Sequence, residues 1–267
     1  MTAISARRRH PLAAAAVLFV TLAVLGALYA ALAPPSQASS ESESSTQIEE
    51  GRQLFLLGCS SCHGLGGEGQ VEDDGTVLGP PLIGVGAAAV DFQVATGRMP
   101  AGPPGAQIVR GQPQFTDEEI DALAAYVASL APGPEIPSAA AVDPELGDVA
   151  RGGEIFRTNC AQCHNTSGQG GALSYGKFAP PLAGVEPRHT YEAMLTGPQA
   201  MPIFNDLTLS PDEKRDIIAF LASIENEPDP GGLGIGRIGP VSEGLWAWLL
   251  GMGALIGTAV WLGAKRS

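Results

Sequence analysis

The chain has 267 residues, of which 45% are hydrophobic and only 16% charged, with 35 glycines and 22 prolines. This composition is rich in loops but apolar enough to fold, and the length suits one large domain or two small domains with attachments. All 28 acidic residues lie between Pro34 and Glu243, and the formal net charge is −13. Such an acidic chain argues against binding to nucleic acid.

Two long apolar runs predict membrane-spanning helices near the two ends of the chain. Residues 12–33 follow the basic segment Arg7–Arg9, and residues 244–264 precede Lys265 and Arg266. Each run is long enough to cross about 30 Å of hydrocarbon as a helix. Because basic flanks stay in the cytoplasm, we expect both termini inside the cell and the acidic middle part on the outer face.

The first run has a second interpretation as a secretory signal peptide. Residues 31–33 (Ala-Leu-Ala) resemble a small-residue cleavage site. The run is longer than the usual signal core of about 7–15 residues, and Pro34 would directly follow the cut. A retained anchor is therefore favoured, and both interpretations export the middle of the chain.

The middle of the chain is an internal repeat. The segment GRQLFLLGCSSCHG (51–64) aligns with GGEIFRTNCAQCHN (152–165), and three shorter blocks follow in the same order in each copy. These blocks are GPPLIGVG with APPLAGVE, GRMP with QAMP, and AYVASL with AFLASI. The second copy lacks a block resembling GPPGAQIV (102–109). Four blocks in one order indicate two domains of similar fold.

Each copy predicts a helix before and a helix after its conserved blocks. The leading helices are expected at about 47–58 and 150–159, and the Gly/Pro-rich middles as loops rather than strands. The trailing helices begin at capping boxes formed by Thr116 with Glu119 and by Ser210 with Glu213, the latter followed by Pro211. Apolar residues then recur at helical spacing on one face: Ile120, Leu123, Val127 and Leu130, and in the second copy Ile217, Phe220, Leu221 and Ile224.

Both copies carry the pattern Cys-x-x-Cys-His, which is typical of covalent haem attachment. Two thiols one helical turn apart can bond to the two vinyl groups of one porphyrin, and the adjacent imidazole can reach the iron. A thioredoxin-like pair would need a βαβ setting, one zinc ion held by all four thiolates would leave both histidines unexplained, and a disulfide is the remaining alternative. The candidates are Cys59, Cys62, Cys160 and Cys163 for covalent attachment and His63 and His164 for the iron.

Two methionines are candidates for the second axial ligand. Met99 and Met201 follow the motif histidines by 36 and 37 residues, and each precedes a proline. Met194 has no counterpart in the first copy, and His189 is the alternative to Met201. A His/Met pair raises the reduction potential and closes the iron site, which favours electron transfer over peroxide or oxygen chemistry.

The prolines of the shared Pro-Pro-Leu block have a candidate supporting role. The carbonyl groups of Pro80 and Pro180 can accept the ring N–H of the motif histidines and fix their orientation. An ordinary rigid turn is the alternative interpretation of these two positions.

Each repeat resembles a class I cytochrome c domain, with the motif after the first helix, the Pro-x-Leu turn, the Met-Pro pair and an aromatic residue (Tyr126, Phe220) in the last helix. The tandem arrangement and the final span LWAWLLGMGALIGTAVWLGAKR make the whole chain similar to the dihaem cytochrome c subunit of the actinobacterial cytochrome bcc complex, a menaquinol:cytochrome c oxidoreductase. The resemblance implies an all-α fold, with two tandem class I cytochrome c domains flanked by N- and C-terminal transmembrane helices, and two covalently bound haem c groups.

The resemblance also implies an electron path from a Rieske iron–sulfur protein, through the two haems, to a terminal oxidase. A Rieske cluster takes two Cys and two His, and this chain has only the four cysteines of its motifs. Its apolar runs lack histidines for b-type haems. The Rieske protein and cytochrome b are therefore expected as separate subunits in the cell membrane. The alternatives are a dihaem subunit of another membrane oxidase or dehydrogenase, a dihaem peroxidase with an open iron site, and a structural tether without haem.

The expected organisation has seven parts in chain order. These are an anchor or signal sequence (1–33), a linker (34–46), cytochrome c domain 1 (47–131), a linker (132–144), cytochrome c domain 2 (145–225), a linker (226–243) and a transmembrane helix (244–264).

Overall fold

The computed structural model describes residues 11–32, 37–102, 105–226 and 240–264. The described chain is mostly helical, which confirms the expected fold class. It divides into two units, Met1–Thr46 and Gln47–Ser267, and both Cys-x-x-Cys-His motifs belong to the second unit.

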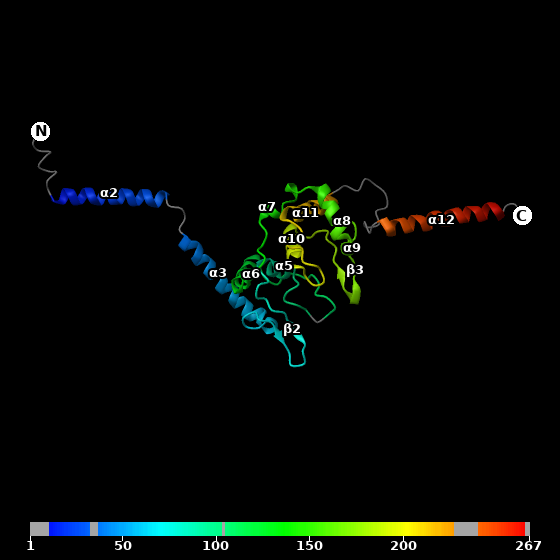
Figure 1. Cartoon of the computed structure of the whole chain (residues 1–267), viewed down its shortest axis with the longest axis horizontal. Helices are drawn as coiled ribbons and strands as arrows, with labels where there is room; N and C mark the ends of the chain where they lie inside the picture. Colours follow the sequence, from blue (N-terminus) through cyan, green and yellow to red (C-terminus); the bar gives the residue numbers. More distant parts are fainter. Residues whose placement is uncertain (1–10, 33–36, 103–104, 227–239, 265–267) are drawn as a thin grey trace, which may run out of the picture. The chain divides into compact units, whose positions relative to one another are not determined.

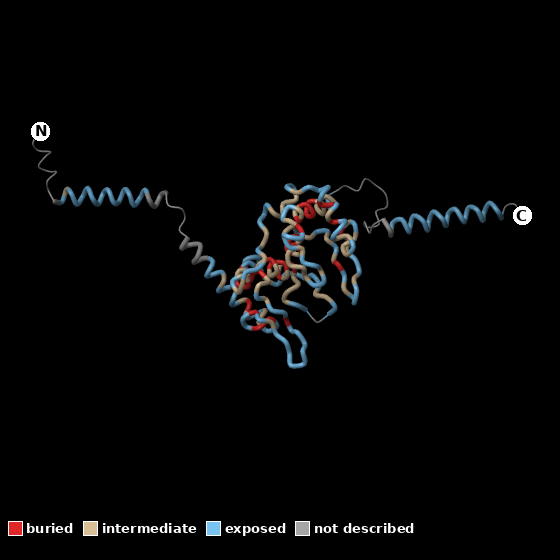
Figure 2. The backbone as a smooth tube through the Cα atoms, viewed as in Figure 1, coloured by how far each residue is buried: buried red, intermediate tan, exposed pale blue. Residues whose placement is uncertain are grey.

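Two apolar helices, α2 (Pro11–Leu32) and α12 (Pro240–Ala264), expose nearly all of their described side chains (Figure 2). Among the described residues, the segment Glu243–Ala264 is long and apolar enough to cross a membrane, whereas the described apolar part of α2, Leu12–Leu28, is shorter. Exposed apolar helices of this kind need a hydrocarbon environment rather than water. They indicate that the protein is anchored to a membrane.

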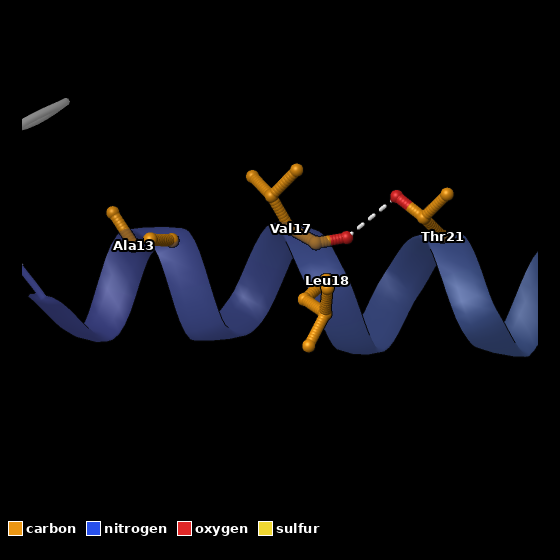
Figure 3. A pocket seen from close by; sticks show the side chains of 5 residues that line it. Ala13, Val17, Leu18 and Thr21 are labelled. Atoms are coloured by element: carbon orange, nitrogen blue, oxygen red, sulfur yellow. Dashed lines mark hydrogen bonds between the residues drawn. The ribbon is translucent and has the colours of Figure 1, made fainter.

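The hydroxyl groups of two threonines, Thr21 on α2 and Thr258 on α12, are satisfied within the helix itself. The Thr21 hydroxyl donates to the Val17 carbonyl at 2.7 Å, beside a shallow hollow on α2 (Figure 3). The Thr258 hydroxyl on α12 donates to the Ala254 carbonyl at 2.8 Å. Because a bilayer offers no water as a partner, this bond to the preceding turn removes the cost of placing a hydroxyl there.

The two repeats have the same order of elements: a leading helix, a short motif helix, a two-stranded hairpin, a middle helix and a trailing helix (Figure 1). The first repeat consists of α3 (Gln37–Gly58), α4 (Ser60–His63), β1 (Gln70–Val71), β2 (Val77–Gly79), α5 (Ala87–Ala95) and α6 (Asp117–Leu130). The second consists of α8 (Val149–Asn159), α9 (Ala161–His164), β3 (Gly171–Ala172), β4 (Phe178–Ala179), α10 (Pro187–Thr196) and α11 (Pro211–Asn226). Short helical turns lie between and within the repeats: α7 (Ala139–Val142), η1 (Pro144–Leu146) and η2 (Ser174–Gly176).

Several elements differ from the sequence-based expectations. Helix α3 begins at Gln37, inside a stretch expected to be a linker, and α7 lies inside the second expected linker. The expectation of loops without strands was wrong, because β1 pairs with β2 and β3 with β4 as antiparallel hairpins. Strands of two or three residues are too short to show an alternating pattern. Helices α5 and α10 were also unexpected, although Pro187 occupies the first turn of α10, where proline is favoured.

Both predicted capping boxes are present and start the trailing helices. The Thr116 hydroxyl accepts from the Glu119 N–H at 3.3 Å, while the Thr116 N–H donates to the Glu119 carboxylate at 2.8 Å. Ser210 and Glu213 make the same reciprocal bonds at 3.4 and 2.7 Å. The apolar faces of the two trailing helices, α6 and α11, point into the domain cores, as expected. Ile120, Leu123, Val127 and Ile217 are buried, and Leu130, Phe220 and Leu221 pack against the same cores.

A pair of aromatic rings joins the leading helix to the trailing helix in each repeat. Phe55 contacts Tyr126 with ring centroids 5.2 Å apart, and Phe156 contacts Phe220 at 5.4 Å. Phe55 and Phe156 are each only 1% exposed and occupy aligned positions of the repeat. The same ring pair therefore holds both cores.

Aligned glycines allow the leading and trailing helices to cross closely. A Cβ atom at Gly51 would collide with the backbone carbonyl of Ala122 on α6, and one at Gly152 would collide with the carbonyl of Asp216 on α11. Glycine is required at both positions because the helix backbones are in direct contact. The position of this crossing determines where the end of each leading helix lies, and with it the motif that follows.

Candidate haem-binding sites

The two Cys-x-x-Cys-His motifs have the same backbone geometry. Each first cysteine directly follows the leading helix, and the next four residues form the short helices α4 and α9. The N–H of His63 donates to the Cys59 carbonyl at 3.0 Å, and the N–H of His164 donates to the Cys160 carbonyl at 2.9 Å. One helical turn thus carries two thiols and an imidazole in each repeat, as the motif requires.

The ring of each motif histidine is held by a proline carbonyl, as predicted from the sequence. The Nδ1 atom of His63 lies 2.8 Å from the Pro80 oxygen, and that of His164 lies 3.0 Å from the Pro180 oxygen. A carbonyl oxygen only accepts, so Nδ1 carries the proton in both rings. The other nitrogen, Nε2, therefore keeps its lone pair for a metal, which is the usual arrangement for a ligating histidine.

A cavity of about 410 Å³ lies against the second motif and brings the predicted haem residues together. Its lining includes Cys160, Cys163, His164 and Met201, with apolar walls from the core of the second domain. Two thiols, an imidazole and a thioether in one apolar cavity suit haem c, whose iron takes His and Met as axial ligands. The residues of the second domain therefore fit the cofactor that the motif predicts.

The corresponding residues of the first domain meet at its core. Cys59 and Met99 both pack against the buried cluster that contains Phe55 and Tyr126. Cys160 and Met201 pack in the same way against the cluster around Phe156 in the second domain. The two methionines thus occupy equivalent places relative to their motifs.

Burial favours the uncharged form of three of the donor groups, Cys59, Cys160 and His164. It raises the pKa of the Cys160 thiol to about 11 and also raises that of Cys59, in each case with a smaller contribution from the second cysteine. It lowers the pKa of His164, which favours the neutral imidazole needed for ligation. All four cysteines are free thiols in the described chain.

The zinc alternative finds no support among the described residues. The group of His, Cys, Asp and Glu side chains that lies close enough to hold a metal there is Asp91, His189 and Glu192, and it contains no cysteine. The two cysteine pairs instead belong to separate repeats, each with its own core.

His189, the alternative to Met201, is engaged by acidic groups where helices α5 and α10 pack together. Its Nε2 atom lies 3.8 Å from an Asp91 oxygen and its Nδ1 atom 3.6 Å from a Glu186 oxygen. The ring also makes an edge contact with Phe92, with centroids 6.4 Å apart. Met194 is 3% exposed and contributes to the core of the second domain. Both His189 and Met194 also line the cavity of the second motif. Met201 stays the predicted ligand because of its matched place in the repeat.

The contact between α5 and α10 also buries two carboxylic groups and an ion pair between the domains. The Arg188 guanidinium of α10 lies 3.3 Å from the Asp91 carboxylate of α5. Burial, together with the nearby Asp91, raises the pKa of Glu192 to about 10, so this side chain is neutral at physiological pH. A neutral Glu192 lets the interface bury it close to the Asp91 carboxylate without adding a second buried negative charge.

The sequence did not predict that the first domain contributes to the cavity of the second. Phe92, Arg98, Gln107 and Arg110 line the same cavity as the second motif. The available signal was the block at 102–109, which the second copy lacks. An insertion in one copy of a repeat marks a place where that copy has an additional contact.

Two helical domains with Cys-x-x-Cys-His motifs, oriented histidines and a matched methionine in each define a tandem c-type cytochrome. Residues 48–131 match the cytochrome c family model, and residues 147–221 match the model for subunit III of the cbb3-type cytochrome c oxidase.

Relatives match the chain over nearly its full length. It is 46% identical to the cytochrome bc1 complex cytochrome c subunit of Mycobacterium leprae, over 93% of this chain and 86% of that protein. It is 45% identical to the same subunit of Mycobacterium tuberculosis H37Rv, over 97% and 93%. For Corynebacterium efficiens the identity is 44%, over 96% and 90%. The chain belongs to the family of cytochrome c subunits of the cytochrome bc1 complex, which transfers electrons in the respiratory chain.

Proposed function

We propose that the chain binds two haem c groups and passes electrons from a Rieske iron–sulfur protein to a terminal oxidase. Cys59 and Cys62 would hold one haem and Cys160 and Cys163 the other. The axial ligands would be His63 with Met99, and His164 with Met201. The observation that carries the proposal is the repeated motif whose histidine is held by a proline carbonyl in both domains.

The residues around each motif favour outer-sphere electron transfer. A haem iron with two axial protein ligands supplies one-electron redox chemistry without an open coordination position. Pro80 and Pro180 orient the imidazoles, and the apolar cores around Phe55 and Phe156 exclude water from the ligands. Two domains on one chain replace a diffusing carrier by a tethered one, because the tether gives a high local concentration.

The proposed membrane topology has two spans, with both termini in the cytoplasm and the two domains on the outer face. The basic residues beyond each apolar helix and the acid-rich middle part support this arrangement. We retain the first helix as an anchor because the apolar run of residues 12–33 is longer than the usual core of a signal peptide and Pro34 would directly follow the cut.

The proposed partners are a cytochrome b subunit, a Rieske subunit and a terminal oxidase. All four cysteines of the chain serve the two motifs, so none is left for an iron–sulfur cluster. Neither apolar run carries a histidine that could ligate a b-type haem in the membrane. Quinol oxidation must therefore take place in other subunits.

Affinity purification of the tagged chain from its native membrane, in mild detergent, tests this assignment. We expect cytochrome b, a Rieske protein and oxidase subunits in the eluate, and quinol should reduce the haems of the purified assembly. Purification of a haem-containing chain with a dehydrogenase in their place would overturn the proposed complex but not the haem sites.

A further inference from the structure

The wall of the second domain's cavity is partly built by the first domain. The contributing residues follow one another along α5 and the segment after it: Phe92, Thr96, Arg98, Gln107, Ile108, Val109 and Arg110. Three of them belong to the block that the second repeat lacks. Phe92, Thr96, Arg98 and Arg110 lie outside that block, so the wall combines the extra block of the first domain with residues on either side of it.

Specific hydrogen bonds hold this segment in place against the second domain. The Gln107 amide nitrogen donates to the Phe178 carbonyl at 2.9 Å, and the Phe178 N–H donates to the Gln107 amide oxygen at 2.9 Å. The Ile108 N–H donates to the Gln199 side-chain oxygen at 3.4 Å. Gln107 thus bonds to the edge of β4 as a neighbouring strand residue would. The paired bonds fix the position of the backbone that carries Arg110.

Two arginines of the first domain therefore face the cavity without an acidic partner. Neither Arg98 nor Arg110 forms a salt bridge among the described residues, whereas the nearby Asp91 pairs with Arg188. The Arg98 guanidinium lies over the Phe92 ring, 4.7 Å from its centroid. A guanidinium stays protonated, so two cations line the same cavity and repel each other in a protein of net charge −13.

An anion in the cavity would relieve this repulsion. Haem carries two propionate groups on the edge opposite its vinyl groups, and the thiols of Cys160 and Cys163 fix the vinyl edge. Guanidinium groups bind carboxylates through paired, charge-assisted hydrogen bonds, and a carboxylate buried in an apolar cavity requires such a partner. The charge and place of the two arginines match this need.

We propose that Arg98 and Arg110 of the first domain bind the propionates of the haem attached to the second domain. The second haem site is then completed by the first domain, which couples the position of one domain to the cofactor of the other. This inference rests on the proposed function, because it requires a haem on Cys160 and Cys163.

The arginines also affect the redox equilibrium of that haem. Fixed positive charge close to the iron favours the reduced form, which carries one positive charge fewer. Removing both cations should therefore lower the reduction potential of the second haem. We expect the ratio of reduced to oxidised haem at a fixed potential to fall about tenfold, which corresponds to about 59 mV for a one-electron couple.

The test is a spectroelectrochemical titration of the full chain in its native complex, comparing the wild type with the double variant Arg98→Gln, Arg110→Gln. Arg52→Gln is the control for a charge change at the surface: it removes one positive charge, against two in the double variant, from an exposed arginine of the first domain that pairs with Glu49. The double variant with both arginines changed to lysine keeps the charge. The variant Met201→His marks the second haem by shifting its potential.

We expect a lowered potential for the second haem in the glutamine variant, little change in the lysine variant and none in the control.

Each outcome of the titration separates this inference from the proposed function. A wild type without a haem on the second motif would refute the proposed function, and the inference with it. Two haems whose potentials respond to the glutamine variant no more than to Arg52→Gln would overturn the inference alone. So would a shift confined to the first haem. If the glutamine variant loses the second haem, retention in the lysine variant supports charge pairing, and equal loss in both overturns it.

Discussion

The two domains share one scaffold but differ in how each site is enclosed. In both, a glycine lets the leading helix cross the trailing helix, a pair of aromatic rings fills the crossing, and a proline carbonyl holds the motif histidine. The cavity of the second domain, however, has a wall from the first, and that wall carries Arg98 and Arg110. The difference teaches that the two attachment sites are alike in geometry, whereas the wall that α5 and the segment after it add to the second cavity makes their surroundings unequal.

The largest expected effect comes from removing one attachment site at a time. The double variants Cys59→Ser, Cys62→Ser and Cys160→Ser, Cys163→Ser should each retain half of the covalent haem, because each motif holds its own group. Electron transfer from quinol to the oxidase should fall to background in both. The pyridine haemochrome spectrum and quinol oxidase assays measure these two quantities. A variant with unchanged haem content would contradict the assignment of that motif.

The next effect tests whether the two helix crossings are equivalent. Gly51→Ala and Gly152→Ala each introduce a Cβ atom into the backbone of the trailing helix, and each should destabilise its domain by about 1–3 kcal/mol. Gly58→Ala is the control, because its added Cβ would meet the Phe115 ring at an ordinary 3.5 Å. Thermal unfolding of the detergent-solubilised chain measures the change. Equal stability of Gly152→Ala and Gly58→Ala would show that the second crossing is looser than the first.

Glu192 provides a pH-dependent test of the contact between the domains. Its pKa is raised to about 10, so between pH 4.5 and 10 the unfolded chain releases a proton that the folded chain keeps. Stability must then fall as the pH rises, by up to about 1.4 kcal/mol for each pH unit. Glu192→Gln imitates the neutral acid and should remove this slope.

Unfolding midpoints at pH 6.5 and 7.5 measure the slope for the wild type, Glu192→Gln and the exposed control Glu145→Gln. The control should keep the wild-type slope. If Glu192→Gln keeps the wild-type slope as well, the Glu192 carboxyl group is ionised in the folded protein, and the contact between α5 and α10 does not contain a neutral acid.

The smallest effect concerns the caps of the trailing helices. Thr116→Ala and Ser210→Ala each remove one hydroxyl that accepts a backbone N–H, at a cost of about 1 kcal/mol. Chemical denaturation of the two variants should give similar losses, because the bonds are alike in both repeats. If only one of the two variants loses stability, tertiary packing supports the two trailing helices to different extents.

Features that depend on neighbouring residues were predictable from the sequence. The motif needs its cysteines and histidine one helical turn apart, and the capping boxes lie within four residues, so both could be recognised directly. The repeat then identified Met99 and Met201 by their matched positions. These two methionines remain predicted ligands, and the domain boundaries likewise remain predictions.

Features that depend on contacts between distant segments could not be predicted. Gln107 bonds Phe178, which is 71 residues away, and Asp91 meets Arg188 on another helix. Nothing in the local pattern around Arg98 or Arg110 indicates which cavity they line. The hairpins and α5 lacked a clear periodic signal because they are short. The missing block in the second repeat shows where to look for such a contact, but not what it does.

The mass of the denatured chain, purified from its native membrane, tests the central claim most directly. Two covalently attached haems predict a mass above that of the polypeptide by two haem groups, with the visible absorbance remaining on the unfolded chain. A chain of polypeptide mass alone, whose colour passes into acidified acetone, would contradict the account.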